Sequence, residues 1–290
     1  MTKREVVKRA LRLKEIPYVP WSFRFTKEIK DILQEYIGGA DIEHYTGNHF
    51  VELGNDFGFF ENVGENLYRD AFGVTWNRTI DKDIGNVKGS LLEEPSLKGY
   101  TFPDPLDPRF FQDIPEKLEC YGDRYRMFSI GFSLYERART MRGLENMLID
   151  FILHPDFVRE LLNAIADYNI AQVREAMKYD IDGVYFGDVW GKQSGLIMGY
   201  DVWKEFIYPV LKKIYTVVHN HGKDVVIHSC GDVDELFDDL VDIGLDLGRE
   251  VDRGRRLARE GDGLDAFRPE HGAEPPTSER PRVVEIGRAH

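Results

Sequence analysis

A histidine and a cysteine two positions apart follow a short apolar run. The run covers residues 224–227 and leads directly into His228, Ser229 and Cys230. Its β-branched composition, ahead of a polar helix start at 232–235, predicts a strand that runs into a helix. Because side chains alternate along a strand, His228 and Cys230 share one face and Ser229 takes the other. Imidazole and thiolate are zinc ligands, so the pair predicts two-thirds of a catalytic zinc site.

The elements that position this pair alternate between strands and helices. Strands are expected at 18–25, 125–132, 183–188 and 224–229, and helices at 27–36, 113–120, 134–140, 143–153, 155–179, 201–221 and 233–243, after an amphipathic basic helix at the N-terminus. Residues 41–110, rich in Gly, Asn, Asp and aromatics, are expected to form a β-rich excursion over one end of the fold. Alternation of this kind predicts parallel βαβ units. In such folds the C-terminal ends of the strands carry the chemistry.

Composition narrows the class of protein. The chain of 290 residues is 42% hydrophobic, which is enough to bury a large core. A net charge of −13 argues against binding to nucleic acid or to an anionic membrane surface. Two cysteines cannot make a disulfide framework, and the sequence shows neither a signal peptide nor an apolar run long enough to span a membrane. We therefore expect a soluble cytoplasmic protein.

The composition changes after residue 247. Residues 248–290 contain nine arginines, no lysine and one aromatic residue, Phe267, and they have no hydrophobic period. The last six residues correspond to one reading frame of a widely used sequencing adapter. We therefore expect residues 248–290 to be a disordered or non-native tail.

Several motifs occur in an order and spacing that resemble the uroporphyrinogen decarboxylase (URO-D) superfamily. They are Thr2–Leu11 followed by Val19-Pro20, Met141-Arg142-Gly143 with its helix up to His154-Pro155, Gly187–Gln193, Phe206–Pro209 and His228–Gly231. The resemblance covers residues 1–247. It implies a (β/α)8 TIM barrel with its active site at the C-terminal ends of the strands. By this analogy His228 lies on about the fifth strand, so the barrel is expected to be truncated after about the fifth unit.

One branch of this superfamily is that of the cobamide-dependent methyltransferases, which the sequence resembles. There a His-x-Cys pair and a later cysteine hold zinc, which lowers the pKa of an acceptor thiol. The resulting thiolate attacks a methyl group on a corrinoid that a partner protein carries. His228 and Cys230 match the first two ligands, whereas the third is expected beyond residue 247. Cys120 precedes the strand at 125–132 and so belongs to the opposite end of the barrel. Asp188 is the better stand-in, as a ligand or a pocket carboxylate.

The other branch is uroporphyrinogen decarboxylase itself, which needs no cofactor. It binds substrate carboxylates with two arginines four positions apart. Arg24 aligns with the first arginine, but Glu28 stands where the second belongs and would repel a polyanion. The catalytic aspartate of that branch has no convincing counterpart, since the surroundings of Asp41 differ. Zinc-dependent methyl transfer is therefore the leading prediction. The alternatives are porphyrinogen decarboxylation and a non-catalytic corrinoid- or tetrapyrrole-binding protein.

Further site residues follow from these positions. Arg24 ends its predicted strand and is expected to contact an anion, while Asp188 is expected to act in catalysis. Trp190 and Gln193 are predicted substrate contacts. Each has a structural alternative: Asp188 as a helix N-cap, Trp190 as a core aromatic residue and Gln193 as a loop hydrogen bonder. His228 and Cys230 could likewise be half-buried residues at a strand end.

Overall fold

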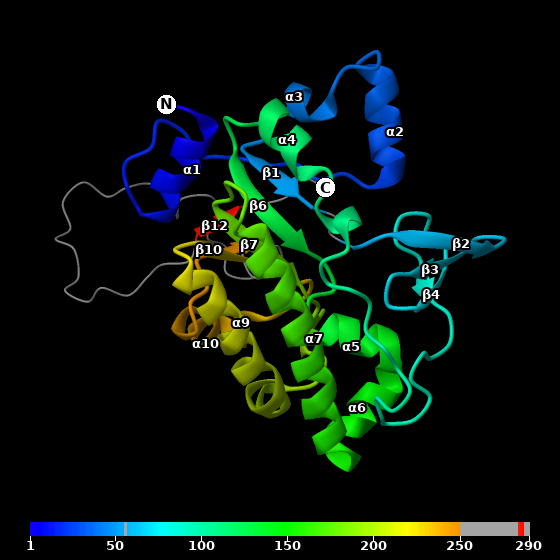
Figure 1. The fold of residues 1–290 in the computed structure, drawn as a ribbon. Coiled ribbons are helices and arrows are strands. Elements are labelled where there is room, and N and C mark those ends of the chain that lie inside the picture. The colour runs from blue at the N-terminus through cyan, green and yellow to red at the C-terminus, as the bar shows by residue number, and fades with distance from the viewer. Residues whose placement is uncertain (55–56, 250–283, 287–290) are drawn as a thin grey trace.

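A parallel sheet runs through the centre of the molecule. The computed structural model describes residues 1–54, 57–249 and 284–286 (Figure 1). Six parallel strands pair in the order β1 (Phe50–Leu53), β6 (Tyr125–Ile130), β7 (Gly183–Gly187), β10 (Asp224–His228), β11 (Leu247–Arg249) and β12 (Val284–Ile286). Their order in the sheet follows their order in the chain, as successive βα units require. The predicted α/β fold with a parallel sheet is confirmed.

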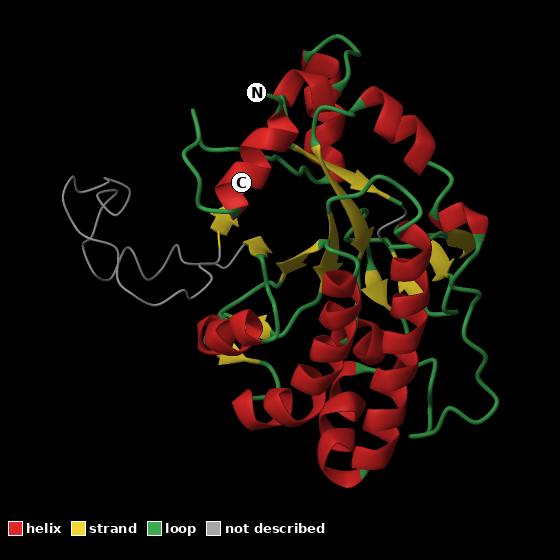
Figure 2. Cartoon of the chain, turned by 60° about the vertical axis from the view of Figure 1, so that its left-hand side comes forward, coloured by secondary structure: helices red, strands yellow, loops and turns green. Residues whose placement is uncertain are grey.

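Helices cover the outer face of this sheet (Figure 2). The helices of the described chain are α1 (Lys3–Leu11), α2 (Lys27–Tyr36), α3 (Ile42–Thr46), α4 (Ile114–Cys120), α5 (Tyr135–Arg142), α6 (Leu144–Leu153), α7 (Pro155–Ala176), α8 (Tyr200–Val202), α9 (Tyr208–Asn220) and α10 (Phe237–Asp242), with the short helical segments η1 (Pro108–Phe110), η2 (Trp203–Ile207) and η3 (Asp234–Leu236). The long helices α7 and α9 pack against each other and contact β6 and β10, respectively. Among the described residues, no helix combines the length and the apolar composition needed to cross a membrane.

The first strand of the sheet is not where the sequence pattern predicts it. Residues 18–25 are extended but form no strand. The carbonyl of Trp21 accepts a bond from the backbone of His49, but the Asn48 side chain bonds both the N–H and the carbonyl of Phe23. The Asn48 side chain thus takes the place of the backbone hydrogen bonds that a neighbouring strand would make with Phe23. The edge strand is β1, which comes from the predicted excursion, so β10 is the fourth strand of the described sheet and not the fifth.

The rest of the excursion is β-rich as predicted. Strands β2 (Phe60–Gly64), β3 (Leu67–Asp70), β4 (Thr75–Asn77) and β5 (Asn86–Val87) form a separate antiparallel sheet. Asp70 is buried there, accepts a bond from Trp76 Nε1, and pairs with Arg137 of α5 at 2.6 Å. This pair attaches the small sheet to the main body. A two-stranded hairpin, β8 (Gly191–Lys192) and β9 (Gly195–Leu196), follows β7.

Helix α1 packs across the N-terminal ends of the strands. Its apolar face buries Val6, Val7 and Ala10. Val7 joins an inner cluster with one or two residues from each of five strands, namely Phe50, Tyr125, Met127, Tyr185, Val226 and Leu247. Because side chains alternate, the neighbouring positions Val184, Val225 and Ile227 enter the larger core under the outer helices. The sheet is therefore buried on both faces, as parallel sheets usually are.

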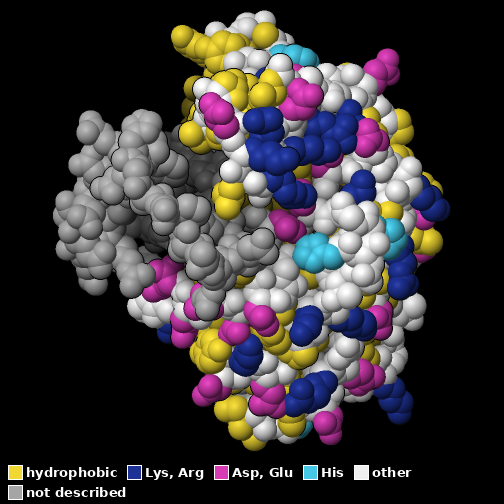
Figure 3. All heavy atoms as spheres, turned by 90° about the vertical axis from the view of Figure 1, so that its left-hand side faces the viewer, with side chains coloured by type: hydrophobic (Ala, Val, Ile, Leu, Met, Phe, Trp, Pro, Cys, Tyr) yellow, Lys and Arg dark blue, Asp and Glu magenta, His cyan; other side chains and the backbone are white. Residues whose placement is uncertain are grey.

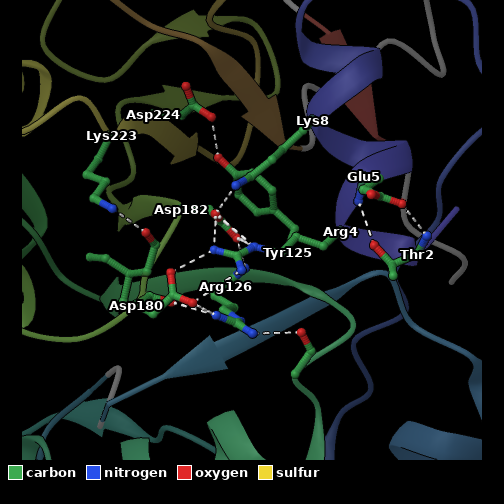
Figure 4. Close-up of polar contacts among 12 residues, drawn as sticks. Thr2, Arg4, Glu5, Lys8, Tyr125, Arg126, Asp180, Asp182, Lys223 and Asp224 are labelled. Atoms are coloured by element: carbon green, nitrogen blue, oxygen red, sulfur yellow. Dashed lines mark hydrogen bonds and ion pairs between the residues drawn. The ribbon is translucent and has the colours of Figure 1, made fainter.

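Ion pairs hold α1 in this place (Figure 4). Arg4 Nη2 and Lys8 Nζ lie 2.7 and 2.6 Å from Asp182, which immediately precedes β7. At the start of β10, Asp224 accepts a bond from Tyr125 at 2.6 Å and pairs with Arg12 at 2.8 Å. Figure 3 shows basic side chains gathered on the side of the molecule that carries α1. The predicted amphipathic basic helix thus closes the end of the sheet opposite to the predicted site.

The described residues do not test two predictions about the barrel. They contain six strands of the parallel sheet, so closure with eight strands and truncation after the fifth unit both stay predictions. Within the predicted tail, β11 runs to Arg249 and β12 pairs with it in parallel. Residues 250–283 and 287–290, on which the remainder of the tail prediction falls, lie outside the described residues.

Candidate functional site

A cavity of about 680 Å³ lies at the C-terminal ends of the strands. Four strands contribute to its wall at or just beyond these ends, through Glu52, Gly131, Gly187 and His228. Residues 22–25 and the β-rich excursion supply the opposite wall, including Phe60. The described part of the fold therefore offers a large cavity at the end where parallel α/β proteins bind their ligands.

The predicted pair faces this cavity. His228 is the last residue of β10, and its Nε2 lies 3.3 Å from the Sγ of Cys230. The intervening Ser229 is buried and accepts a bond from the Trp190 backbone at 3.2 Å, so it points the other way. Gly231 follows with φ of +80°, and a Cβ there would lie 2.4 Å from the backbone of Gly191. This backbone contact explains why glycine follows the pair, and it fixes the turn that presents Cys230.

The separation of the two donor atoms fits a shared metal ion. Zinc bonds of ~2.3 Å to sulfur and ~2.0 Å to nitrogen at a tetrahedral angle place the two donors ~3.5 Å apart. The observed 3.3 Å is close to that span. No third His, Cys, Asp or Glu joins them in the part of the chain that the structure describes. Cys120 is exposed at the end of α4 and does not line the cavity. The residues present thus supply two donors of the kind that zinc prefers.

Arg24 also lies in the cavity wall, although its segment is not a strand. Its Nη1 donates to the hydroxyl of Tyr185 at 3.0 Å, and its Nη2 lies 2.9 Å from Glu52. The guanidinium also sits 5.5 Å from the centre of the Tyr185 ring. Tyr185 projects from the middle of β7 to the same side as His228, because the two strands pair in register. Arg24 is therefore a positioned cation at the cavity, already paired with one carboxylate.

Asp188 follows the end of β7, as the sequence predicts, but its side chain is directed to the start of α5. Its side chain is buried, and its Oδ2 accepts bonds from the Tyr135 backbone at 2.9 Å and from Trp190 Nε1 at 2.8 Å. Its Oδ1 accepts from the Glu136 backbone at 2.6 Å. The carboxylate thereby satisfies two of the free N–H groups that begin α5. Burial raises the pKa of Asp188 to about 6 against the effect of these bonds. Its two oxygens thus bind three N–H donors, and Asp188 is not among the residues that line the cavity.

The two predicted substrate contacts are also displaced. Trp190 is 1% exposed, and its ring packs 5.9 Å from that of Trp203. Its indole N–H is directed at Asp188, so it is a core residue. Gln193 is exposed in the tight turn between β8 and β9 and lines no part of the cavity. The donors that engage Asp188 come from the start of α5, about 50 residues away in the chain, and the roles predicted for Asp188, Trp190 and Gln193 stay predictions.

Sequence reasoning singled out none of the four carboxylates in the described cavity wall, and Glu136 is one of them. It stands in the first turn of α5, and its side chain is 12% exposed. Burial and the nearby Asp188 raise the pKa of Glu136 to about 7, although Arg139 opposes the rise. Its Oε1 accepts a bond from Arg139 at 2.8 Å. A glutamate at a helix start soon after a strand of the parallel sheet was the signal for it in the sequence.

The charges of the described wall balance. Four basic side chains and four acidic ones line the cavity: Arg24, Lys30, Arg78, Lys117, Glu43, Glu52, Asp83 and Glu136. Arg24 is paired with Glu52, and Lys117 lies 2.6 Å from Asp113. A site for a substrate with many carboxylates would need a clear excess of cations. This wall does not provide one.

Comparisons with known proteins agree with this architecture. The family model for uroporphyrinogen decarboxylase (URO-D) matches residues 131–260, which begin directly after β6 and include the ends of β7 and β10. This part of the chain belongs to the URO-D family. Among solved structures, the chain is similar to a methyltransferase from Methanosarcina mazei, with a TM-score of 0.63. The two are 17% identical, and the match covers 86% of this chain and 75% of the other. At that identity the likeness shows the fold. A search of curated proteins gives no match.

Proposed function

We propose that this URO-D family protein moves a methyl group between a corrinoid protein and a small thiol, with zinc as cofactor. The observation that carries the proposal is the donor pair, His228 Nε2 and Cys230 Sγ, 3.3 Å apart in the wall of the cavity. The similarity in fold to an archaeal methyltransferase supports it. The balanced charge of the wall and Glu28 at the position of a second arginine disfavour a porphyrinogen decarboxylase.

His228 and Cys230 would hold the zinc. When bound, zinc lowers the pKa of a thiol that binds to it and so favours the nucleophilic thiolate at neutral pH. The remaining ligand is not among the described residues, and Asp188 is not available for it because its oxygens cap α5. In this proposal Arg24, held by Tyr185 and Glu52, orients an anionic group of the substrate. The cavity volume of about 680 Å³ leaves room for the thiol and for the reactive face of a corrinoid.

Zinc content tests the proposal directly. Wild-type protein is expected to hold zinc stoichiometrically, and Cys230→Ala or His228→Ala is expected to weaken zinc binding more than ~100-fold, since outer-shell changes alone cost ~10–100-fold. Cys120→Ala is the matched control, because that cysteine is exposed and lies away from the cavity. Equal zinc content in the Cys230 and Cys120 variants would contradict the assignment.

Activity assays then separate the three candidate functions. Transfer from methylcobalamin to 2-mercaptoethanol that depends on Cys230 supports methyl transfer. Release of CO2 from uroporphyrinogen by metal-free protein would establish decarboxylation instead. Tight binding of a corrinoid without either product would identify a binding protein.

A further inference from the structure

Glu136 lies in the same cavity as the donor pair, and three contacts fix its position. Its backbone N–H donates to Asp188 at 2.6 Å, and the backbone N–H of Asp188 donates to the carbonyl of His228 at 3.0 Å. The start of α5 is therefore tied through the end of β7 to the end of β10. On the side chain, Arg139 holds Oε1 at 2.8 Å. Within the described residues, Oε2 makes no hydrogen bond, so it is left for a ligand in the cavity.

The charged and titratable groups around Glu136 come from five segments of the chain. Arg137 and Arg139 stand on its own helix, and Asp188 follows β7. Arg137 is already paired with the buried Asp70, which leaves Arg139 as the partner of Glu136. On the cavity side, β10 contributes His228 and Cys230, and β1 and the segment before α2 contribute Glu52 and Arg24. With one partly exposed arginine as its counterion, the carboxylate keeps an appreciable affinity for a proton near neutral pH.

We infer that Glu136 is the base that takes the proton from the acceptor thiol. This inference rests on the proposed methyl transfer. The S–H bond breaks and an O–H bond forms on Glu136. The sulfur electron pair then forms a bond to the methyl carbon of the methylated corrinoid. The bond from that carbon to cobalt breaks, and its electron pair stays on cobalt. Glu136 releases the proton to solvent once the thioether has left.

The test varies the acidity of the thiol. Glu136→Gln keeps the size of the side chain and an oxygen that accepts from Arg139, but it cannot take up a proton. With 2-mercaptoethanol, which carries its proton at neutral pH, the rate of transfer from methylcobalamin is expected to fall ~100-fold, the lower end for general base catalysis. With an aromatic thiol that is already ionised at the assay pH, the rate is expected to stay within about threefold of wild type. Glu145→Gln, an exposed glutamate in the first turn of α6, is the control and should leave both rates unchanged.

Each result decides a different point. A loss with 2-mercaptoethanol that vanishes with the ionised thiol supports the inference. Equal losses with both thiols would show that Glu136 only positions other groups, which overturns the inference and leaves methyl transfer standing. Absence of transfer by the zinc-loaded wild-type protein with either thiol would overturn methyl transfer and the inference together. A second readout does not depend on turnover: in difference infrared spectroscopy the wild-type protein should show two carboxyl bands that titrate near neutral pH, from Asp188 and Glu136, and Glu136→Gln should lose one of them. Equal carboxyl absorption in wild type and Glu136→Gln would refute the assignment.

Discussion

Replacing Glu136 by glutamine is expected to change how the free energy of unfolding depends on pH. Burial and Asp188 raise the pKa of Glu136 from 4.5 to about 7. Between these values the folded protein holds a proton that the unfolded chain has released, so stability falls as the pH rises. Below about pH 4.5 the carboxyl is protonated in the folded and in the unfolded state, so it does not lower the free energy of unfolding. Above about pH 7 both are ionised and the full cost is present.

The size of the effect follows from the two pKa values. They differ by about 2.5 pKa units, and at ~1.36 kcal/mol for each the ionised carboxylate costs about 3 kcal/mol of stability. Little of this is screened by solvent, because the side chain is 12% exposed. The favourable ion pair with Arg139 is already contained in this net cost, because Arg139 opposes the rise of the Glu136 pKa. Glu136→Gln should therefore be more stable than wild type by about 2–3 kcal/mol near pH 8, and roughly equal near pH 5.

Urea unfolding followed by tryptophan fluorescence, at about pH 5 and about pH 8, measures the difference. Glu145→Gln is the matched control, since its side chain is exposed and its pH dependence should parallel that of wild type. If the curves for Glu136→Gln and wild type also run parallel between these pH values, the carboxyl is not buried as the structure shows. The proton affinity on which the proposed base depends would then be absent.

Two further predictions concern buried polar groups that support the site. Asp188→Ala should lower the free energy of unfolding by about 2–4 kcal/mol, because it leaves three buried donors without an acceptor; stability equal to wild type in urea unfolding would restore a purely functional role. Arg142→Met should cost about 3–5 kcal/mol, because it leaves the buried Asp150 unpaired. Lys213→Met, which breaks the exposed pair with Asp167, should cost less than ~1 kcal/mol in the same assay, and equal losses would contradict the argument from burial.

Local patterns predict much of this fold correctly. From β6 to α10 the expected strands and helices appear within a few residues of their predicted ends, because apolar periodicity and clear start and stop signals occur there. The pattern fails at residues 18–25, where the Asn48 side chain occupies the backbone groups of Phe23. That bond joins segments about 25 residues apart. The sequence pattern around residues 18–25 gives no sign of this bond.

The sequence by itself placed His228 and Cys230 together at the end of a strand, although β10 ends at His228 and a turn presents Cys230. It also determined the parallel α/β class and the family. Only the tertiary structure decided which carboxylate reaches the cavity. Asp188 and Glu136 both sit at the end of a strand or the start of a helix, and each looks suitable from its neighbours in the chain. Packing directs Asp188 to the N–H groups that begin α5 and turns Glu136 to the cavity, because a buried carboxylate must find hydrogen-bond donors wherever the fold brings them.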